Sequence, residues 1–203
     1  LADDQKPRFT QIQDEQAALA KAFSDHVLDA TDSFIHLVSS QADLIGLPED
    51  AIAAAADTAK QKGLEGWAFT LHFPSYYPVQ QYSQNRSLRR LLYEAYVTRA
   101  SELAPQYSKG NIEWDNTHNM IEQLRLRDEE ARMLGFDNYA ALSLAPKMAR
   151  DVSEVDSFLT DFAKRARPFA QKDWNELQEF ARSLGLVHGI EPWDMAFVSE
   201  RLK

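Results

Sequence analysis

Leu134–Arg150, which reads L-G-F-D-N-Y-A-A-L-S-L-A-P-K-M-A-R, is the stretch that decides the fold. A helical segment rich in Arg and Glu runs into it. This segment is predicted to end at Gly135, because glycine adopts the left-handed conformation of a helix C-terminus without a Cβ clash. Phe136 would then fold back on Ala131 in the last helical turn. The stretch therefore predicts a helix end followed by a tight change of chain direction.

Two more helices are expected to begin inside this stretch or just after it. Asp137 or Asn138 can accept hydrogen bonds from the free backbone N–H groups at the start of a short helix, which is expected to end at Pro146. Asp151 or Ser153 starts a long helix. The sequence thus predicts a corner at which three helices meet, as in a mainly α-helical fold.

Helical periodicity continues on both sides of this corner. Apolar residues recur at spacings of three, four and seven, which places them on one face of each helix. The expected helices cover 9–38, 48–62, 88–103, 116–134, 153–184 and 192–203. The side chains predicted to face the core from 116–134 and 153–184 include Met120, Leu124, Ala131, Leu134, Phe158, Leu159, Phe162, Phe169 and Phe180. The final helix has a start signal but no stop signal, so Trp193 and Phe197 are expected to pack on segments beyond Lys203.

One segment has the composition of a β-strand. Trp67–Phe73 alternates aromatic side chains with others and is predicted to be extended. A lone strand is unstable, and Ser39–Leu44 is the nearest candidate for its partner, with the direction of pairing left open. Pro74 and Pro78 predict an extended or turn segment after the strand. The fold class is therefore mainly α: one multi-helix domain or part-domain over residues 1–203, with a small two-stranded β element.

The composition is typical of a globular protein and disfavours several kinds of partner. The chain has 44% hydrophobic and 26% charged residues, and its net charge of −9 disfavours binding to nucleic acid or to anionic membrane surfaces. No apolar run approaches the roughly 18 residues of a membrane span. The absence of cysteine excludes disulfides and thiolate zinc sites, and fits a reducing compartment such as the cytoplasm. Arg89 with Arg90, and Arg125 with Arg127, are interpreted as solvated, ion-paired surface.

The sequence carries no recognisable catalytic or metal-binding motif. The histidines are His26, His36, His72, His118 and His188. No two are four residues apart and none follows a glutamate by three, as the common helical metal motifs require. Asp115 and His118 are interpreted as a helix cap followed by a surface histidine. His72 is either a polar residue on the strand or a contact to a peptide, and Tyr76 and Tyr77 either pack inside or present hydroxyls to a cleft. Catalytic, cofactor-binding and metal-ligating residues are accordingly predicted to be none.

Several short segments together resemble the zinc oligopeptidase family of oligopeptidase A and thimet oligopeptidase. The corner contributes L-G-F-D-N-Y-A and S-L-A-P-K-M-A, and other segments follow in the family's order over nearly the whole chain. These other segments are 28–31, 46–48, 74–76, 85–89, 96–101 and 192–194. The agreement is best with the bacterial oligopeptidase A members. One departure matters for mechanism, because the family's H-E-x-x-H zinc motif is absent from this sequence.

The resemblance implies a two-lobed helical enzyme with a deep channel, which cleaves short peptides internally in the cytoplasm. Its zinc would be held by the two histidines of H-E-x-x-H and a downstream glutamate, all outside this stretch. Residues 1–203 would be an interior, non-catalytic fragment, incomplete at the C-terminus and at the N-terminus, that forms part of the channel wall. Its partners would be short peptides and the remaining catalytic segments of the same chain. The alternative is a non-catalytic helical adapter or peptide-binding scaffold, which the lack of visible chemistry favours.

Overall fold

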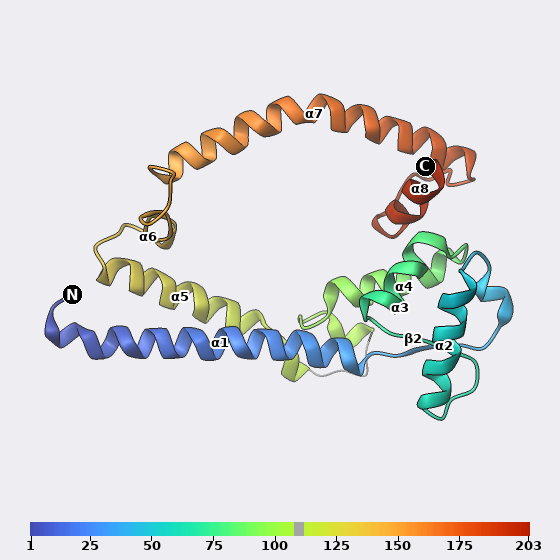
Figure 1. Cartoon of the computed structure of the whole chain (residues 1–203), viewed down its shortest axis with the longest axis horizontal. Coiled ribbons are helices and arrows are strands. Elements are labelled where there is room, and N and C mark those ends of the chain that lie inside the picture. The colour runs from blue at the N-terminus through green and yellow to red at the C-terminus, as the bar shows by residue number, and fades with distance from the viewer. Residues whose placement is uncertain (108–111) are drawn as a thin grey trace. The chain divides into compact units, whose positions relative to one another are not determined.

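The computed structural model describes residues 1–107 and 112–203, and its regular structure is mainly helical (Figure 1). The helices are α1 (Lys6–Ser33), α2 (Glu49–Gln61), α3 (Phe73–Tyr82), α4 (Arg86–Thr98), α5 (Thr117–Met133), α6 (Tyr139–Leu144), α7 (Val152–Ser183) and α8 (Met195–Leu202). The strands β1 (His36–Val38) and β2 (Trp67–Phe69) form a two-stranded sheet. The predicted fold class, mainly α with a small two-stranded element, is confirmed. Within the described ranges, no helix is long and apolar enough to cross a membrane.

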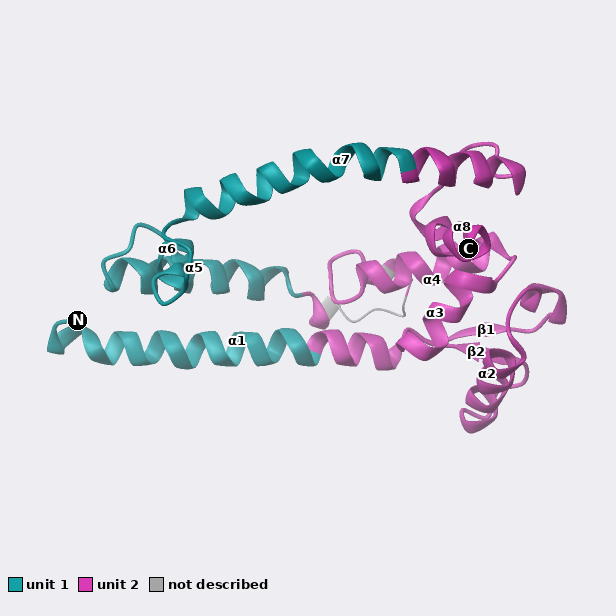
Figure 2. Cartoon of the chain, turned by 45° about the horizontal axis from the view of Figure 1, so that its top comes forward, with its two compact units in different colours: residues 1–25, 116–172 teal, residues 26–115, 173–203 magenta. Residues whose placement is uncertain are grey.

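The chain divides into two compact units, coloured separately in Figure 2. Unit 1 combines Leu1–Asp25 with Asn116–Lys172, and unit 2 combines His26–Asp115 with Asp173–Lys203. Each unit is therefore assembled from two segments that are far apart in the sequence. The long helices α1 and α7 each contribute residues to both units.

The helix junction in unit 1 forms as its sequence predicts. Gly135 has φ +81°, and the amide of Phe136 donates to the carbonyl of Ala131 at 2.9 Å, which completes a Schellman motif at the end of α5. Of the two candidates for the next cap, Asn138 is the residue used, since its Oδ1 accepts from an amide in the first turn of α6. Asp151 begins α7 in the same way, by accepting from the amide of Glu154 at 2.8 Å.

Most of the predicted core face of α5, and that of the N-terminal part of α7, is wrong. Met120 and Leu124 are 48% and 65% exposed, and α5 buries Asn119 and Leu126 in their place, while Ala131 is buried as predicted. On α7 the aromatic residues predicted to be core are also exposed, namely Phe158, Phe162 and Phe169, together with Leu159. Periodicity identifies residues that share a face, but a face becomes buried only where another element covers it. In unit 1, the element that covers α5 is α1. Arg8 on α1 donates hydrogen bonds of 2.6 and 2.7 Å to the carboxylate of Glu129 on α5.

The sheet of unit 2 differs from the sequence prediction in its partner strand. β1 pairs antiparallel with β2, His36 opposite Phe69 and Val38 opposite Trp67, so the partner precedes the Ser39–Leu44 segment that was expected. Residues 41–44 form a 3-10 turn instead. The backbone of Gly66 lies close to that of Val38, and this contact fixes the register. Only glycine fits there, because φ is +104° and an added Cβ would lie 2.5 Å from the carbonyl oxygen of Val38. The direction of pairing, which the sequence left open, is thereby settled.

The segment after β2 is helical, which corrects two further predictions. The strand ends at Phe69, so His72 lies at the N-cap of α3 rather than in the strand. Pro74 occupies the first turn of α3, where no N–H bond is lost, and Pro78 lies inside the helix. The missing amide of Pro78 removes one bond only, and helical geometry lets Tyr76 and Val79 enter the core.

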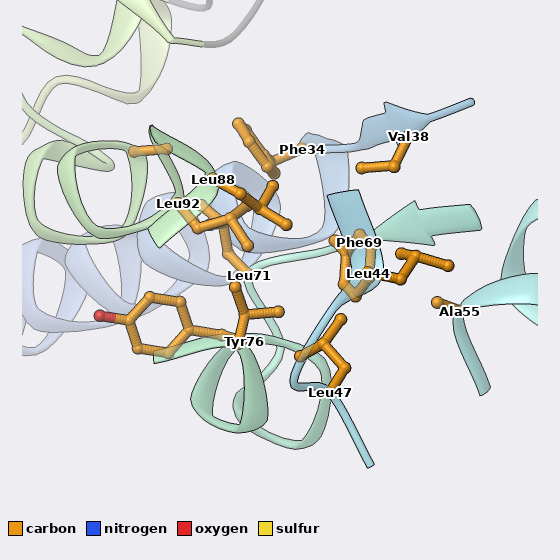
Figure 3. Packing of buried hydrophobic residues seen from close by; sticks show 12 residues of the cluster. Phe34, Val38, Leu44, Leu47, Ala55, Phe69, Leu71, Tyr76, Leu88 and Leu92 are labelled. Carbon is orange, nitrogen blue, oxygen red and sulfur yellow. The ribbon is translucent and has the colours of Figure 1, made fainter. Parts of the chain in front are cut away.

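The core of unit 2 gathers side chains from both strands, α2, α3 and α4, and from the segments that connect α1, the strands and the helices (Figure 3). Its buried members are Phe34, Val38, Leu44, Leu47, Ala55, Phe69, Leu71, Tyr76, Val79, Leu88, Leu92 and Ala95. A second, smaller cluster joins the end of α7 to α8, where Ala181, Phe197 and Val198 are buried. Phe197, expected to pack beyond Lys203, is thus covered within the described chain.

Candidate functional site

The histidines, the usual carriers of acid–base or metal chemistry, lie on five different segments. His26 lies on α1, His36 on β1 and His118 on α5, while His72 is the N-cap of α3 and His188 follows α7. Burial lowers the pKa of His36, which keeps its ring neutral. His118 is exposed, as predicted, and the N-cap of its helix is Asn116.

His72 forms an ion-pair contact with a carboxylate. Its Nε2 lies 2.9 Å from Oδ1 of Asp32, and both side chains are about half exposed. The pair borders a pocket of about 430 Å³ in unit 2, whose lining also includes Phe34, Lys62 and Ser75. A histidine paired with one carboxylate can orient or relay a proton, but the hydroxyls of Ser33 and Ser75 that also line the pocket are bonded to backbone groups and not to His72. Contact of His72 with a peptide stays a prediction.

The two tyrosines singled out in the sequence have different environments. Tyr76 is buried and its ring stacks on Tyr96 with 4.2 Å between centroids. Burial, reinforced by neighbouring tyrosines, raises the pKa of Tyr76, so its phenol stays protonated. Tyr77 is partly exposed and stacks on Phe73 at 4.8 Å. Tyr76 is therefore a core residue, which is one of the two alternatives that the sequence left open.

The most distinctive polar feature is a buried ion-pair centre in unit 2, made by Arg86, Arg89 and Asp194. Arg89 Nη2 donates to Oδ1 of Asp194 at 2.6 Å, and both side chains are at most 1% exposed. Arg86 donates through Nε and Nη2 to the same carboxylate, the shortest contact being 2.7 Å. Asp194 also accepts from the amide of Glu191 and so caps the turn that precedes α8. The centre thus fastens α4 to the C-terminal segment.

Arg89 supports this centre through every group of its guanidinium. Nε donates to the carbonyl of Trp193 at 3.1 Å and Nη1 to the carbonyl of Ser83 at 2.7 Å. Its guanidinium also stacks on the ring of Phe197, with 3.9 Å between Cζ and the centroid. Buried polar groups must find partners inside the protein, and here each of the three guanidinium nitrogens has one.

The protonation states follow from a balance between burial and pairing. Burial on its own would raise the pKa of Asp194, but the hydrogen bonds from Arg86 and Arg89 outweigh it, and the net effect lowers the pKa. Burial lowers the pKa of Arg89, and the hydrogen bond to Asp194 opposes this effect. The carboxylate is therefore ionised at neutral pH, and the centre is a charged one.

Sequence reasoning missed this centre, because it interpreted Arg89 with Arg90 as solvated surface. That interpretation is wrong for Arg89 and holds for Arg90, whose side chain is 59% exposed and pairs with Glu94. The sequence did contain a signal for the burial of Arg89. Leu92 follows it by three positions and Tyr96 by seven, so Arg89 lies on the edge of the apolar face of α4. The residues also belong to two of the family-like segments, 85–89 and 192–194, which the structure brings together.

The described residues do not fit a zinc site. Over residues 1–107 and 112–203, no group of three or more His, Cys, Asp or Glu side chains is placed so that it could hold a metal ion. A protein zinc site needs at least three such ligands. The pair of His72 and Asp32 supplies only two, and Asp194 already accepts from two arginines. No step through a metal is therefore derived from these residues.

Comparison with known proteins covers the whole chain. Residues 79–203, which include the ion-pair centre, match Peptidase family M3. The chain is 45% identical over 203 residues to oligopeptidase A of Escherichia coli K12, and 43% identical to oligopeptidase A of Haemophilus influenzae. It is 28% identical over 205 residues to dipeptidyl carboxypeptidase of Escherichia coli K12. All of this chain is covered in each case, and it spans 29% of the length of each relative.

The ordered segments that resembled the zinc oligopeptidases therefore correspond to a match along the full sequence. The family match alone extends over more than half of the chain, from Val79 to Lys203. The chain belongs to peptidase family M3.

Proposed function

We propose that residues 1–203 are a helical part of a zinc-dependent oligopeptidase that cleaves short peptides internally. The observation that carries this proposal is the 43–45% identity to bacterial proteins named oligopeptidase A, sustained over the whole chain. Because the chain spans only 29% of their length, the peptidase activity is proposed for the larger protein and not for these residues alone.

In that protein, this stretch is a helical domain or part-domain that forms part of the wall of the substrate channel. The zinc ligands lie outside it, in H-E-x-x-H and a downstream glutamate, and no residue of this stretch is assigned a catalytic, cofactor-binding or metal role. This division is supported by the described residues, among which no three His, Cys, Asp or Glu side chains are grouped so that they could hold a metal ion. The enzyme works in the cytoplasm on short peptides, and one relative, from Arabidopsis thaliana, is named a probable cytosolic oligopeptidase A.

The first test measures zinc binding and peptide cleavage by the 203-residue chain. Calorimetric titration with zinc and a quenched fluorescent peptide assay should both give no signal, while oligopeptidase A of Escherichia coli, run alongside, turns the peptide over. Stoichiometric tight zinc binding, or turnover that a chelator abolishes, would contradict the proposed division of roles.

The second test concerns the channel wall. In the full-length protein, a substrate peptide that carries a photoreactive benzophenone group should label residues 1–203, and excess unlabelled peptide should compete. Labelling restricted to other parts of the protein would refute a role of this stretch in the channel.

The alternative function is a non-catalytic helical adapter or peptide-binding scaffold. The ion-pair centre of Arg86, Arg89 and Asp194 is compatible with this function as well as with the peptidase, because its groups hold the fold together. The coding sequence that follows residue 203 separates the two functions. H-E-x-x-H on a helical segment supports the peptidase, because its two histidines lie one helical turn apart and can bind one zinc ion; a sequence without it supports the adapter.

A further inference from the structure

A pocket of about 320 Å³ opens beside the ion-pair centre of unit 2. Its lining combines three guanidinium groups, from α4 and α8, with apolar side chains from the turn after α7 and from α8, and with Gln84 just before α4. The arginines are Arg86, Arg89 and Arg201, and the apolar residues are Leu184, Leu186 and Phe197. A cationic side and an apolar side therefore face the same small volume.

The arginines differ in how far their donors are already used. Arg89 has a protein partner at Nε, Nη1 and Nη2. Arg86 uses Nε and Nη2 for Asp194 and is 41% exposed, which leaves Nη1 for another acceptor. Arg201 makes no hydrogen bond and no ion pair to the described part of the chain; its guanidinium rests on the ring of Phe197, 3.8 Å from Cζ to the centroid. Arg201 and the outer side of Arg86 are thus available to a ligand.

The carboxylates nearby do not balance these charges. Within the described ranges, Asp194 is the only acidic residue at ion-pair distance from Arg86 or Arg89. Glu191 is exposed and acts on Arg86 through its charge alone. Burial lowers the pKa of Arg89, and the positive charges of Arg86 and Arg201 lower it further, while Asp194 raises it. A local excess of positive charge on a chain with a net charge of −9 marks a place where an anion is stabilised.

We propose that this pocket binds a carboxylate carried by a small apolar group. Arg201 and Nη1 of Arg86 receive the carboxylate, because a guanidinium fork matches its two oxygens. Leu184 and Leu186 cover the apolar group and remove it from water. Arg89 holds the site in place through Asp194 without giving up its own partners.

Two sources can supply such a carboxylate: the C-terminal residue of a free peptide, or an acidic or terminal residue from another segment of the same polypeptide. The binding chemistry is the same in both. Phenylglyoxal, which modifies accessible arginines, distinguishes them in the full-length protein of the proposed function. Protection of Arg201 only when a carboxylate ligand is added identifies a free ligand; protection without any ligand identifies a segment of the protein. The binding measurement itself uses the 203-residue chain and does not depend on peptidase activity.

The probe is N-acetyl-leucine, with N-acetyl-leucine amide as the uncharged control and acetate as the control without an apolar group. Titrations are followed by NMR of the arginine Nε–H groups and of the backbone amides of Leu186 and Val198. N-acetyl-leucine should give saturable shifts, on the order of millimolar affinity, and both controls should bind about tenfold or more weakly. Added salt should weaken the binding, since the charges at the mouth of the pocket are screened.

Variants locate the binding. Arg201→Gln should weaken binding about tenfold, and Arg201→Lys should restore part of the affinity, since it keeps the charge but loses the fork. Arg167→Gln, at an exposed arginine of unit 1, is the matched control and should leave the affinity unchanged. Thermal unfolding of each variant confirms that it folds, and the wild-type titration stands whatever a variant does. The proposal is overturned if the wild-type chain shows no saturable shift, if the amide binds as tightly as the acid, or if folded Arg201→Gln keeps the wild-type affinity.

Discussion

Replacing Arg89 by methionine should be among the most destabilising single changes in unit 2. Methionine replaces the apolar stem of the arginine with a flexible, unbranched side chain and carries no donor, so the effect reports mainly on the guanidinium. The change removes the hydrogen bond to Asp194 and leaves the carbonyls of Ser83 and Trp193 without a donor. The groups that lose this donor lie in the C-terminal segment and, for Ser83, at the end of α3, so the change loosens the attachment of α4 to both.

The magnitude follows from burial. Removing one partner of a buried ion pair costs about 3–5 kcal/mol, because the other charge stays buried. Asp194 keeps Arg86, which favours the lower end of this range, but two carbonyls lose a donor at about 1 kcal/mol or more each. We therefore expect the free energy of unfolding to fall by about 3–5 kcal/mol, against a total of about 5–15 kcal/mol for a typical domain.

Urea denaturation followed by circular dichroism measures this loss. Arg90→Met is the matched control: the neighbouring side chain is 59% exposed and pairs with Glu94 on the surface, so its loss should cost less than about 1 kcal/mol. Arg89→Lys should fall between the two, since an ammonium keeps the charge but cannot serve three acceptors in a plane. If Arg89→Met costs no more than Arg90→Met, the centre does not hold α4 to the C-terminal segment and the reasoning is refuted.

Three further predictions follow from other groups. The folded-state pKa of Asp194 lies below its unfolded value of about 4, so its stabilising contribution is present above that pH and is lost as the pH falls through the folded pKa. The difference in unfolding free energy between wild type and Asp194→Asn should therefore shrink below pH about 4, and a constant difference would contradict the assignment. Gly135→Ala should cost about 1–2 kcal/mol in urea denaturation, because φ is +81° while the space for a Cβ is open; an unchanged midpoint would show that the left-handed conformation is not needed. The exposed aromatics of α7 should make the chain self-associate, and replacing Phe158, Phe162 and Phe169 by serine should lower the mass seen by light scattering at high concentration; equal masses would contradict this.

Part of the candidate site was within reach of the sequence, and part was not. The segments 85–89 and 192–194 stood out by their resemblance to the oligopeptidase family, but nothing local indicated that they touch. Arg89 and Asp194 are 105 positions apart. An arginine beside another arginine on a helix is typical of solvated surface, and only a carboxylate brought in by a distant segment makes its burial possible.

The sequence by itself determined where most helices begin and end. Gly135 and Asn138 act through hydrogen bonds to residues within five positions, so their effect is the same in any tertiary context. Tertiary structure alone decided which faces are covered: Leu124 is 65% exposed although apolar, and Arg89 is 1% exposed although charged. The physical reason is that capping is satisfied within one turn of chain, whereas burial depends on which remote element lies opposite, and the periodicity of a helix carries no information about that element.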